Sequence, residues 1–401
     1  MPVGTFFTRI GYKMNAFFQK TGLILPLILI FTGLPDTFAQ APKNKDDAPI
    51  VNVGGALRFN YNLSSWKTGQ KKRGGDFGFD VFRINAEATW RRLSLNAEYR
   101  LYSSGFGGGI LKHGWITYDI NPVSEVQVGL SQVPFGIRPY SSNSWFFTFP
   151  YYIGFEDDYD MGVKYVYRKE NLEFDLAYYH SAEDLVFSDR SPSANRYSYD
   201  ITGPNKENQT FNGQFVIPFG EQQYHRIGAS GMWGRLYNIE SEEQGDRHAL
   251  ALHYQYKPAK YLNLKIQALT YDFRPVYPEG DELPFLIMGA YGANYQVALG
   301  GEVYSLAISY ELPVNFGPIT QLTFYEDYAF FDKRNPDFED THMNVVGMMV
   351  TAGQVYTYFD YAAGYNHPWL GPVWTTALST GNQEDDTQWS ARFNVNIGYY
   401  F

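Results

Sequence analysis

Apolar and polar side chains alternate along most of the chain after residue 50, in stretches of about nine to fourteen residues. This period of two is typical of β-strands that have one face in an apolar environment and the other in a polar one. The pattern predicts sixteen strands, near 50–62, 77–90, 92–102, 110–120, 124–133, 159–168, 171–180, 209–218, 224–237, 247–257, 260–272, 301–311, 318–330, 341–351, 353–365 and 388–401.

A further candidate strand, 285–297, is assigned to the loop 273–300, because an odd number of strands would leave the two termini on opposite sides. With sixteen strands, short connections such as 91–92 alternate with long polar ones. Closing the sheet removes the unpaired edges that hydrocarbon does not tolerate. We therefore expect an all-β, transmembrane antiparallel barrel with periplasmic termini and a lumen wide enough for water. The long outer loops are 134–158, 182–206, 273–300 and 366–388.

The last nine residues place an apolar side chain at every second position and stop on an aromatic one. A strand between lipid and an aqueous lumen needs this pattern, with the intervening polar residues turned inward. The pattern resembles the C-terminal signal by which outer-membrane barrels are handed to the barrel assembly machinery. Its outward residues are Phe393, Val395, Ile397, Tyr399 and Phe401.

The N-terminal region has the features of a secretory signal peptide. An apolar run over 23–31 follows Lys13 and Lys20 and precedes small-residue cleavage sites near 37–41. The run is short for a bilayer span, although an uncleaved N-terminal anchor is the alternative. We assign 1–41 to the signal peptide, with Met14 as a possible true start, then a short periplasmic segment at 42–49 and one barrel domain at 50–401. The short segment leaves no room for a folded plug domain.

Composition supports a barrel over other classes of protein. The chain is 18% aromatic, with 34 Tyr, 31 Phe and 8 Trp, as expected of aromatic girdles at two membrane interfaces. The mean hydropathy of −0.34 excludes a bundle of membrane helices but not a barrel, in which only alternate residues face lipid. The alternative is a secreted, aromatic-rich, lectin-like β protein. Removing 1–41 takes away three basic residues and one acidic one, so the formal charge of −10 becomes −12 and argues against nucleic acid as a partner.

Strand alternation also predicts a charged inner wall on the first three strands. A charge that faces lipid near the midplane would cost about 2–4 kcal/mol, so these side chains must point inward. These side chains either act in ion selection or only form ion pairs that neutralise one another on the inner wall. The predicted lining residues are Arg58, Arg83, Glu87, Glu98 and Arg100.

The third outer loop, 134–158, carries many aromatic residues between Pro134 and Tyr152. So much apolar surface needs a partner, so we expect the loop to fold into the lumen and narrow it. Packing against a neighbouring subunit is the alternative. The charged residues of this constriction loop are Arg138, Glu156, Asp157 and Asp158.

The strand over 128–136, which ends in Pro134-Phe135-Gly136, resembles the corresponding stretch of the phosphate-selective porin O and P family. The resemblance implies a sixteen-stranded trimeric porin whose constriction gathers basic residues for anions. The chain departs from that pattern, because the third loop has one basic residue, Arg138, and three acidic ones. Acids on the loop and arginines on the wall look more like the transverse field of a general porin, which admits small ions of both signs.

We find no constellation for catalysis and predict no enzyme, cofactor or metal site. The acidic run 156–160 has oxygens enough for calcium but lacks the spacing of an EF-hand loop. The sequence therefore predicts a Gram-negative outer-membrane porin for passive diffusion of small polar solutes and ions, in contact with lipid and lipopolysaccharide. A closed barrel that acts as a surface receptor is the alternative.

Overall fold

The computed structural model describes residues 48–183, 191–258, 261–280, 282–382 and 388–401. The predicted signal peptide, 1–41, lies outside these residues. The chain divides at Pro49/Ile50 into two units, and the second unit, Ile50–Phe401, is the one described below. Among the described residues, no helix has the length and apolar character needed to cross a membrane.

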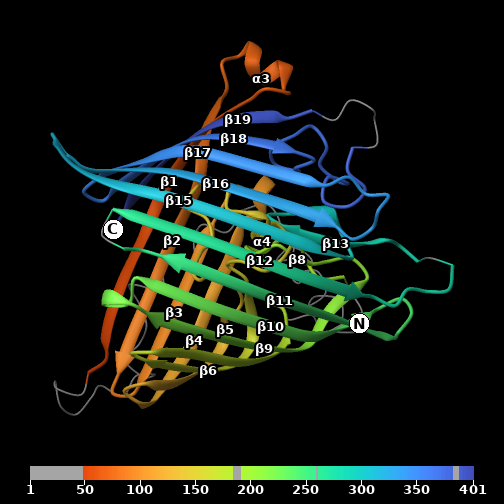
Figure 1. The fold of residues 1–401 in the computed structure, drawn as a ribbon, viewed down its shortest axis with the longest axis horizontal. Coiled ribbons are helices and arrows are strands. Elements are labelled where there is room, and N and C mark those ends of the chain that lie inside the picture. Colours follow the sequence, from red (N-terminus) through yellow and green to blue (C-terminus); the bar gives the residue numbers. More distant parts are fainter. Residues whose placement is uncertain (1–47, 184–190, 259–260, 281, 383–387) are drawn as a thin grey trace, which may run out of the picture. The chain divides into compact units, whose positions relative to one another are not determined.

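Sixteen antiparallel strands close into a barrel in which each strand pairs with its sequence neighbours and β1 pairs with β19 (Figure 1). This closure leaves no strand edge unpaired. The strands are β1 (Ile50–Ser64), β2 (Asp76–Trp90), β3 (Leu93–Leu101), β4 (Gly109–Asn121), β5 (Ser124–Gln132), β6 (Tyr159–Lys169), β7 (Leu172–Ser181), β9 (Asn205–Phe219), β10 (His225–Asn238), β11 (Gln244–Tyr256), β12 (Leu262–Arg274), β15 (Gly300–Phe316), β16 (Ile319–Lys333), β17 (Thr341–Ala352), β18 (Val355–Tyr365) and β19 (Ser390–Tyr400).

All sixteen predicted strands are confirmed, most of them within a few residues of the expected bounds. The assignment of 285–297 to a loop is confirmed as well, but this segment is itself ordered as a hairpin of β13 (Phe285–Ala290) and β14 (Ala293–Ala298). Tyr291 and Gly292 both have positive φ, as a two-residue hairpin turn requires. A short strand, β8 (Asp200–Ile201), completes a second, three-stranded sheet.

The last strand shows the predicted alternation most clearly. Phe393, Ile397 and Tyr399 are exposed on the outside of the barrel, whereas Asn394 and Asn396 are buried inside it. The terminal Phe401 closes the ring, because its amide donates to the carbonyl of Gly55 on β1 and its own carbonyl accepts from the Gly55 amide. The role of Phe393, Val395, Ile397, Tyr399 and Phe401 in assembly stays a prediction.

The two ends of the barrel differ. At one end, the short-turn end, strands are joined by tight connections such as 91–92, 170–171 and 353–354. At the other, the long-loop end, the connections include 133–158, 275–299 and the β1–β2 loop with helix α3 (Thr68–Lys72). Helix α4 (Phe149–Tyr152) and the β8–β13–β14 sheet belong to these loops and appear within the outline of the barrel in Figure 1.

Candidate constriction and solute path

The third loop, 133–158, turns into the lumen directly after β5. Gly136 makes the turn with φ of 62°, and a Cβ there would lie 2.5 Å from the side chain of Gln267 on β12. The close approach lets the Ile137 amide donate to Gln267 Oε1 at 2.7 Å and the Gly136 amide donate to Ser230 Oγ on β10 at 3.1 Å. Glycine suits this position because other residues rarely adopt its positive φ, and because a Cβ would displace the Gln267 side chain from the loop amide that it accepts.

Asp327, on the inner face of β16, holds the middle of the loop. Its carboxylate accepts hydrogen bonds from the amide of Asn143 at 2.9 and 3.0 Å and from the amide of Ser144 at 2.6 Å. The Asn143 side chain donates to the same carboxylate at 3.0 Å. Lys265 on β12 adds donors to the carbonyls of Tyr140 and Ser142, at 3.1 and 2.7 Å. The loop therefore reaches from β5 to wall strands far from it in the ring.

The aromatic part of the loop is buried against wall strands and other long loops. Phe149, Tyr151 and Tyr152 are at most 3% exposed. They pack with aromatic residues of three other long loops, and the Tyr295 hydroxyl donates to the Tyr152 carbonyl at 2.6 Å. The partners from these loops include Tyr197, Tyr199, Tyr291, Tyr295 and His367.

Asp157 and Asp158, two charged residues of the predicted constriction loop, are both buried. Asp157 is 2% exposed and Asp158 is 8% exposed. Asp157 pairs with Lys112 of β4 at 3.2 Å and accepts hydrogen bonds from the hydroxyls of Tyr159 at 2.8 Å and Tyr197 at 2.6 Å. The sequence could not show these partners, because their positions depend on the path of the loop.

Glu156 is also buried, and it ties the two limbs of the loop together. It accepts from the Ser141 amide at 3.0 Å, from the Ser141 hydroxyl at 2.5 Å and from the Thr148 hydroxyl at 3.1 Å. Burial raises the pKa of Glu156 to about 7, although these donors favour the ionised form. The carboxyl group therefore titrates near neutral pH.

The five wall residues predicted from the first strands lie on one face, but they are unequal in exposure. Glu98 bridges two guanidiniums, Arg100 at 2.5 Å and Arg83 at 3.5 Å. Arg58 pairs with Asp80 at 3.0 Å and stacks 4.2 Å from the ring of Trp145 in the third loop. These contacts support the mutual pairing that the sequence left open. Glu87 is exposed and accepts a hydrogen bond from Asn96 at 3.3 Å.

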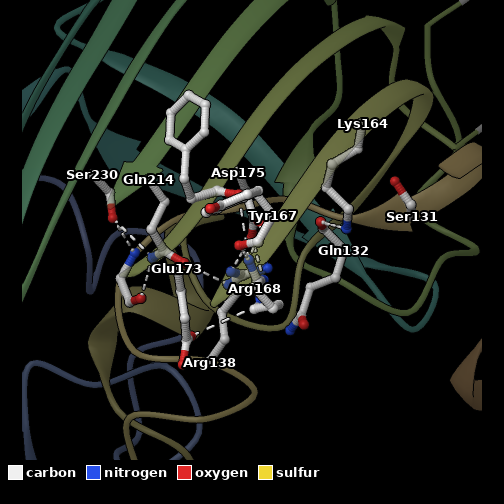
Figure 2. Close-up of polar contacts among 12 residues, drawn as sticks. Ser131, Gln132, Arg138, Lys164, Tyr167, Arg168, Glu173, Asp175, Gln214 and Ser230 are labelled. Carbon is white, nitrogen blue, oxygen red and sulfur yellow. Dashed lines mark hydrogen bonds and ion pairs between the residues drawn. The ribbon is translucent and has the colours of Figure 1, made fainter. Parts of the chain in front are cut away.

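A second group of charges surrounds Arg138, and we call it the Arg138 cluster: Arg138, Arg168, Arg226, Glu173 and Asp175. Figure 2 labels all of these residues except Arg226. Arg138 donates to Asp175 of β7 and, at 2.7 Å, to Gln214 of β9. Arg168 also binds Asp175, at 2.5 Å, and Arg226 binds Glu173 at 2.6 Å. The Arg168 and Arg226 side chains are 38% and 35% exposed, whereas Asp175 is completely buried. Solvent in this part of the lumen therefore contacts guanidinium more than carboxylate.

Sequence reasoning identified Arg138 but missed its partners on the wall. Strand alternation contains the signal for them, because Arg168, Glu173 and Asp175 occupy inward positions next to the turn between β6 and β7.

No family model matches the sequence, and no curated protein sequence is similar to it. Solved structures do match in fold. An anion-selective porin from Comamonas acidovorans aligns with a TM-score of 0.58 and 13% identity over 88% of this chain and 100% of that one. The chain has the fold of a porin-type outer-membrane barrel.

Two other outer-membrane neighbours support the same fold. The trimer form of OmpT, an outer membrane protein of Vibrio cholerae, aligns with a TM-score of 0.56 and 14% identity over 88% of this chain and 100% of that one. The outer membrane channel DcaP of Acinetobacter baumannii aligns with a TM-score of 0.53 and 11% identity over 90% and 99%. Identities this low show the fold alone, and they leave membership of the phosphate-selective porins as a prediction.

Replacing Asp327 with alanine should loosen the third loop, because two backbone amides and one side-chain amide lose their buried acceptor. We expect the free energy of unfolding to fall by about 3 kcal/mol, measured by urea unfolding in detergent micelles. Asp332→Ala, at an exposed position of the same strand, is the matched control. Equal stability of the two variants would show that Asp327 does not anchor the loop.

The raised pKa of Glu156 predicts that its contribution to stability changes with pH. The neutral carboxyl is the form that tolerates burial. The stabilisation that it gives the folded state is therefore complete below the ordinary pKa of a glutamate and is lost as pH rises through about 7. Between about pH 5 and 8.5, wild-type stability should fall by about 2–3 kcal/mol through this group, and Glu156→Gln should remove that pH dependence. Unfolding curves at each pH measure this, with exposed Glu221→Gln as the control. Parallel curves for wild type and Glu156→Gln would contradict it.

Proposed function

We propose that the protein is an outer-membrane porin that passes small polar solutes and ions by diffusion, and that it is not an enzyme. The observation that carries the proposal is the closed sixteen-stranded barrel with an apolar outer face and a charged, partly solvated inner wall. The signal peptide, the C-terminal assembly signal, and the placing of the termini and short turns in the periplasm belong to the same proposal. Lipid, lipopolysaccharide and the barrel assembly machinery are its implied partners.

We further propose that the channel prefers anions to cations. The Arg138 cluster offers three guanidiniums against two carboxylates, and the more exposed groups are the positive ones. Positive charge on a water-filled wall raises the local concentration of anions. The resemblance to phosphate-selective porins and the fold shared with an anion-selective porin agree with this sign. Phosphate is one candidate anion within this class.

Arg226→Gln tests the preference, because it removes one exposed positive charge while Glu173 retains Arg168 at 3.8 Å. The reversal potential of the purified protein in a planar bilayer, under a salt gradient, should move toward cation selectivity. We expect the permeability ratio of anion to cation to fall about two-fold. Arg274→Gln, at an exposed site at the long-loop end of β12, should change nothing. An unchanged ratio in Arg226→Gln would place the Arg138 cluster away from the ion path.

A closed barrel that acts as a surface receptor is the second candidate, and the buried aromatic residues of the long loops favour it. Tyr151, Tyr197, Tyr199 and Tyr295 are at most 3% exposed, so the loops that carry them pack tightly together. The same bilayer recording separates the two candidates. Stable open steps from the folded wild-type protein support the channel, and silence from a correctly folded barrel supports the receptor.

We also propose a homotrimer, in line with the trimer form of one structural neighbour. Glu326 lies halfway along β16 with its side chain exposed on the outer face, between Phe324 and Tyr328, and accepts a hydrogen bond from Asn344 at 3.0 Å. An acid facing hydrocarbon at this depth is unfavourable, although less so than a basic residue. A protein neighbour at this face would remove the conflict, so we place part of the subunit interface at β16 and β17.

Glu326→Arg should dissociate the assembly, because three symmetry-related positive charges would enter the interface. Unheated gel mobility and chemical crosslinking in detergent should show loss of the oligomer while the barrel stays folded. Asp332→Arg, on the same face but at the strand end, should leave the oligomer intact. An oligomer that survives Glu326→Arg would place the interface on other strands.

A further inference from the structure

Three buried aspartates meet where the third loop rejoins the barrel. Asp158 ends the loop, Asp160 is the second residue of β6, and Asp200 lies on β8 in the next long loop. One carboxylate oxygen from each lies within 4.8 Å of the others, and the residues are 8%, 2% and 2% exposed. We call these three residues the aspartate triad. The sequence could not reveal it, because Asp200 is far from the other two along the chain.

The triad and its surroundings carry more carboxyl groups than guanidinium groups. Glu183 and Glu207 add two more carboxyl groups close by, and two arginines oppose them. Arg196 binds Asp200 at 2.6 Å and Glu183 at 3.0 Å, and Arg247 forms a two-pronged pair with Glu207. Among the described residues, five carboxyls therefore face two guanidiniums. Uncompensated charge at such depth is expensive unless it is neutralised.

Asp160 supplies a second, independent observation. Its Oδ1 atom is buried and has no hydrogen-bond partner among the described residues, although its carboxylate points into the triad. The Oδ1 of Asp158 accepts a hydrogen bond from the amide of the adjacent Tyr159, at 2.9 Å. Asp200 is better satisfied, by Arg196 and by the Ile201 amide at 2.6 Å. Buried carboxylate oxygens without donors are expected where a cation binds instead.

We propose that the aspartate triad binds one calcium ion. Calcium takes oxygen ligands at 2.3–2.6 Å, so two ligands on opposite sides of the ion lie about 5 Å apart. The three aspartate oxygens all lie within 4.8 Å of one another, which fits this span. Calcium also accepts buried, irregular carboxylate sites, whereas magnesium keeps much of its water shell. The bound ion would join the third loop to β6 and to the loop that carries β8.

The competing explanation is that protons neutralise the triad. Burial, and then the nearby Asp200, Glu207 and Glu183, raise the pKa of Asp158 well above its ordinary value when no ion is considered. Shared protons and a calcium ion make opposite predictions for an aspartate-to-asparagine change. Asparagine mimics a protonated aspartate, so it would stabilise a proton-sharing cluster, whereas it would weaken a calcium site.

The test uses full-length protein in detergent, stripped of metal with a chelator and titrated with calcium chloride in a calorimeter. We expect one ion per chain and a higher thermal unfolding midpoint in calcium than in chelator. Asp160→Asn should weaken calcium binding at least about ten-fold, because it removes a charged ligand. Asp332→Asn, an exposed acid at the long-loop end of β16, should bind calcium as the wild type does.

Three results would overturn the proposal: no heat and no calcium-dependent shift in wild-type protein, equal affinity for magnesium, or an Asp160→Asn protein that binds calcium as tightly as the wild type. If Asp160→Asn does not fold, the wild-type titration and the Asp158→Asn variant decide. These readouts concern binding and stability, so they do not depend on whether the barrel conducts.

Discussion

The pairing of every backbone amide and carbonyl in the barrel wall is the constraint on which the rest of the structure depends. Hydrocarbon offers no hydrogen bonds, so a sheet that crosses it must close on itself. Here the closure is made between β1 and β19, with Phe401 paired to Gly55 at one end of the seam. Once the ring is closed, each strand has one face toward lipid and one toward the lumen, and the period of two in the sequence follows directly.

The same closure creates a second requirement inside the ring. Many inward side chains are polar or charged, and some of these lie too deep for bulk water to solvate them. The long loops supply their partners. Asp327 accepts hydrogen bonds from amides of the third loop, Lys112 forms an ion pair with Asp157, and Arg58 stacks on Trp145. Wall and loop are therefore interdependent. The wall charges determine where the loop can lie, and the loop satisfies charges that the wall alone would leave unpaired.

This division explains how far the sequence could predict the structure. Strands and their faces were accessible, because they follow from local alternation and from the need for closure. Departures from alternation were not: a β-bulge between Glu98 and Tyr99 lets Lys112 and His113, which are adjacent, both be buried on the inner side. The contacts of the acidic loop residues were also inaccessible, because they join segments from different loops. Asp158 meets Asp200 only because two loops fold back into one lumen.

The distribution of burial also separates the charge of the chain from the charge of the lumen. The formal charge of the whole chain is −10, which suggests a cation-attracting protein. Yet Asp157, Asp175 and Glu98 are buried against basic partners, while Arg168 and Arg226 keep a third or more of their side chains exposed. A mobile ion responds to the charges that water can reach, because buried pairs present little net field. The sign of selectivity in such a barrel must therefore be judged from the exposed groups of the inner wall, and those around Arg138 are positive.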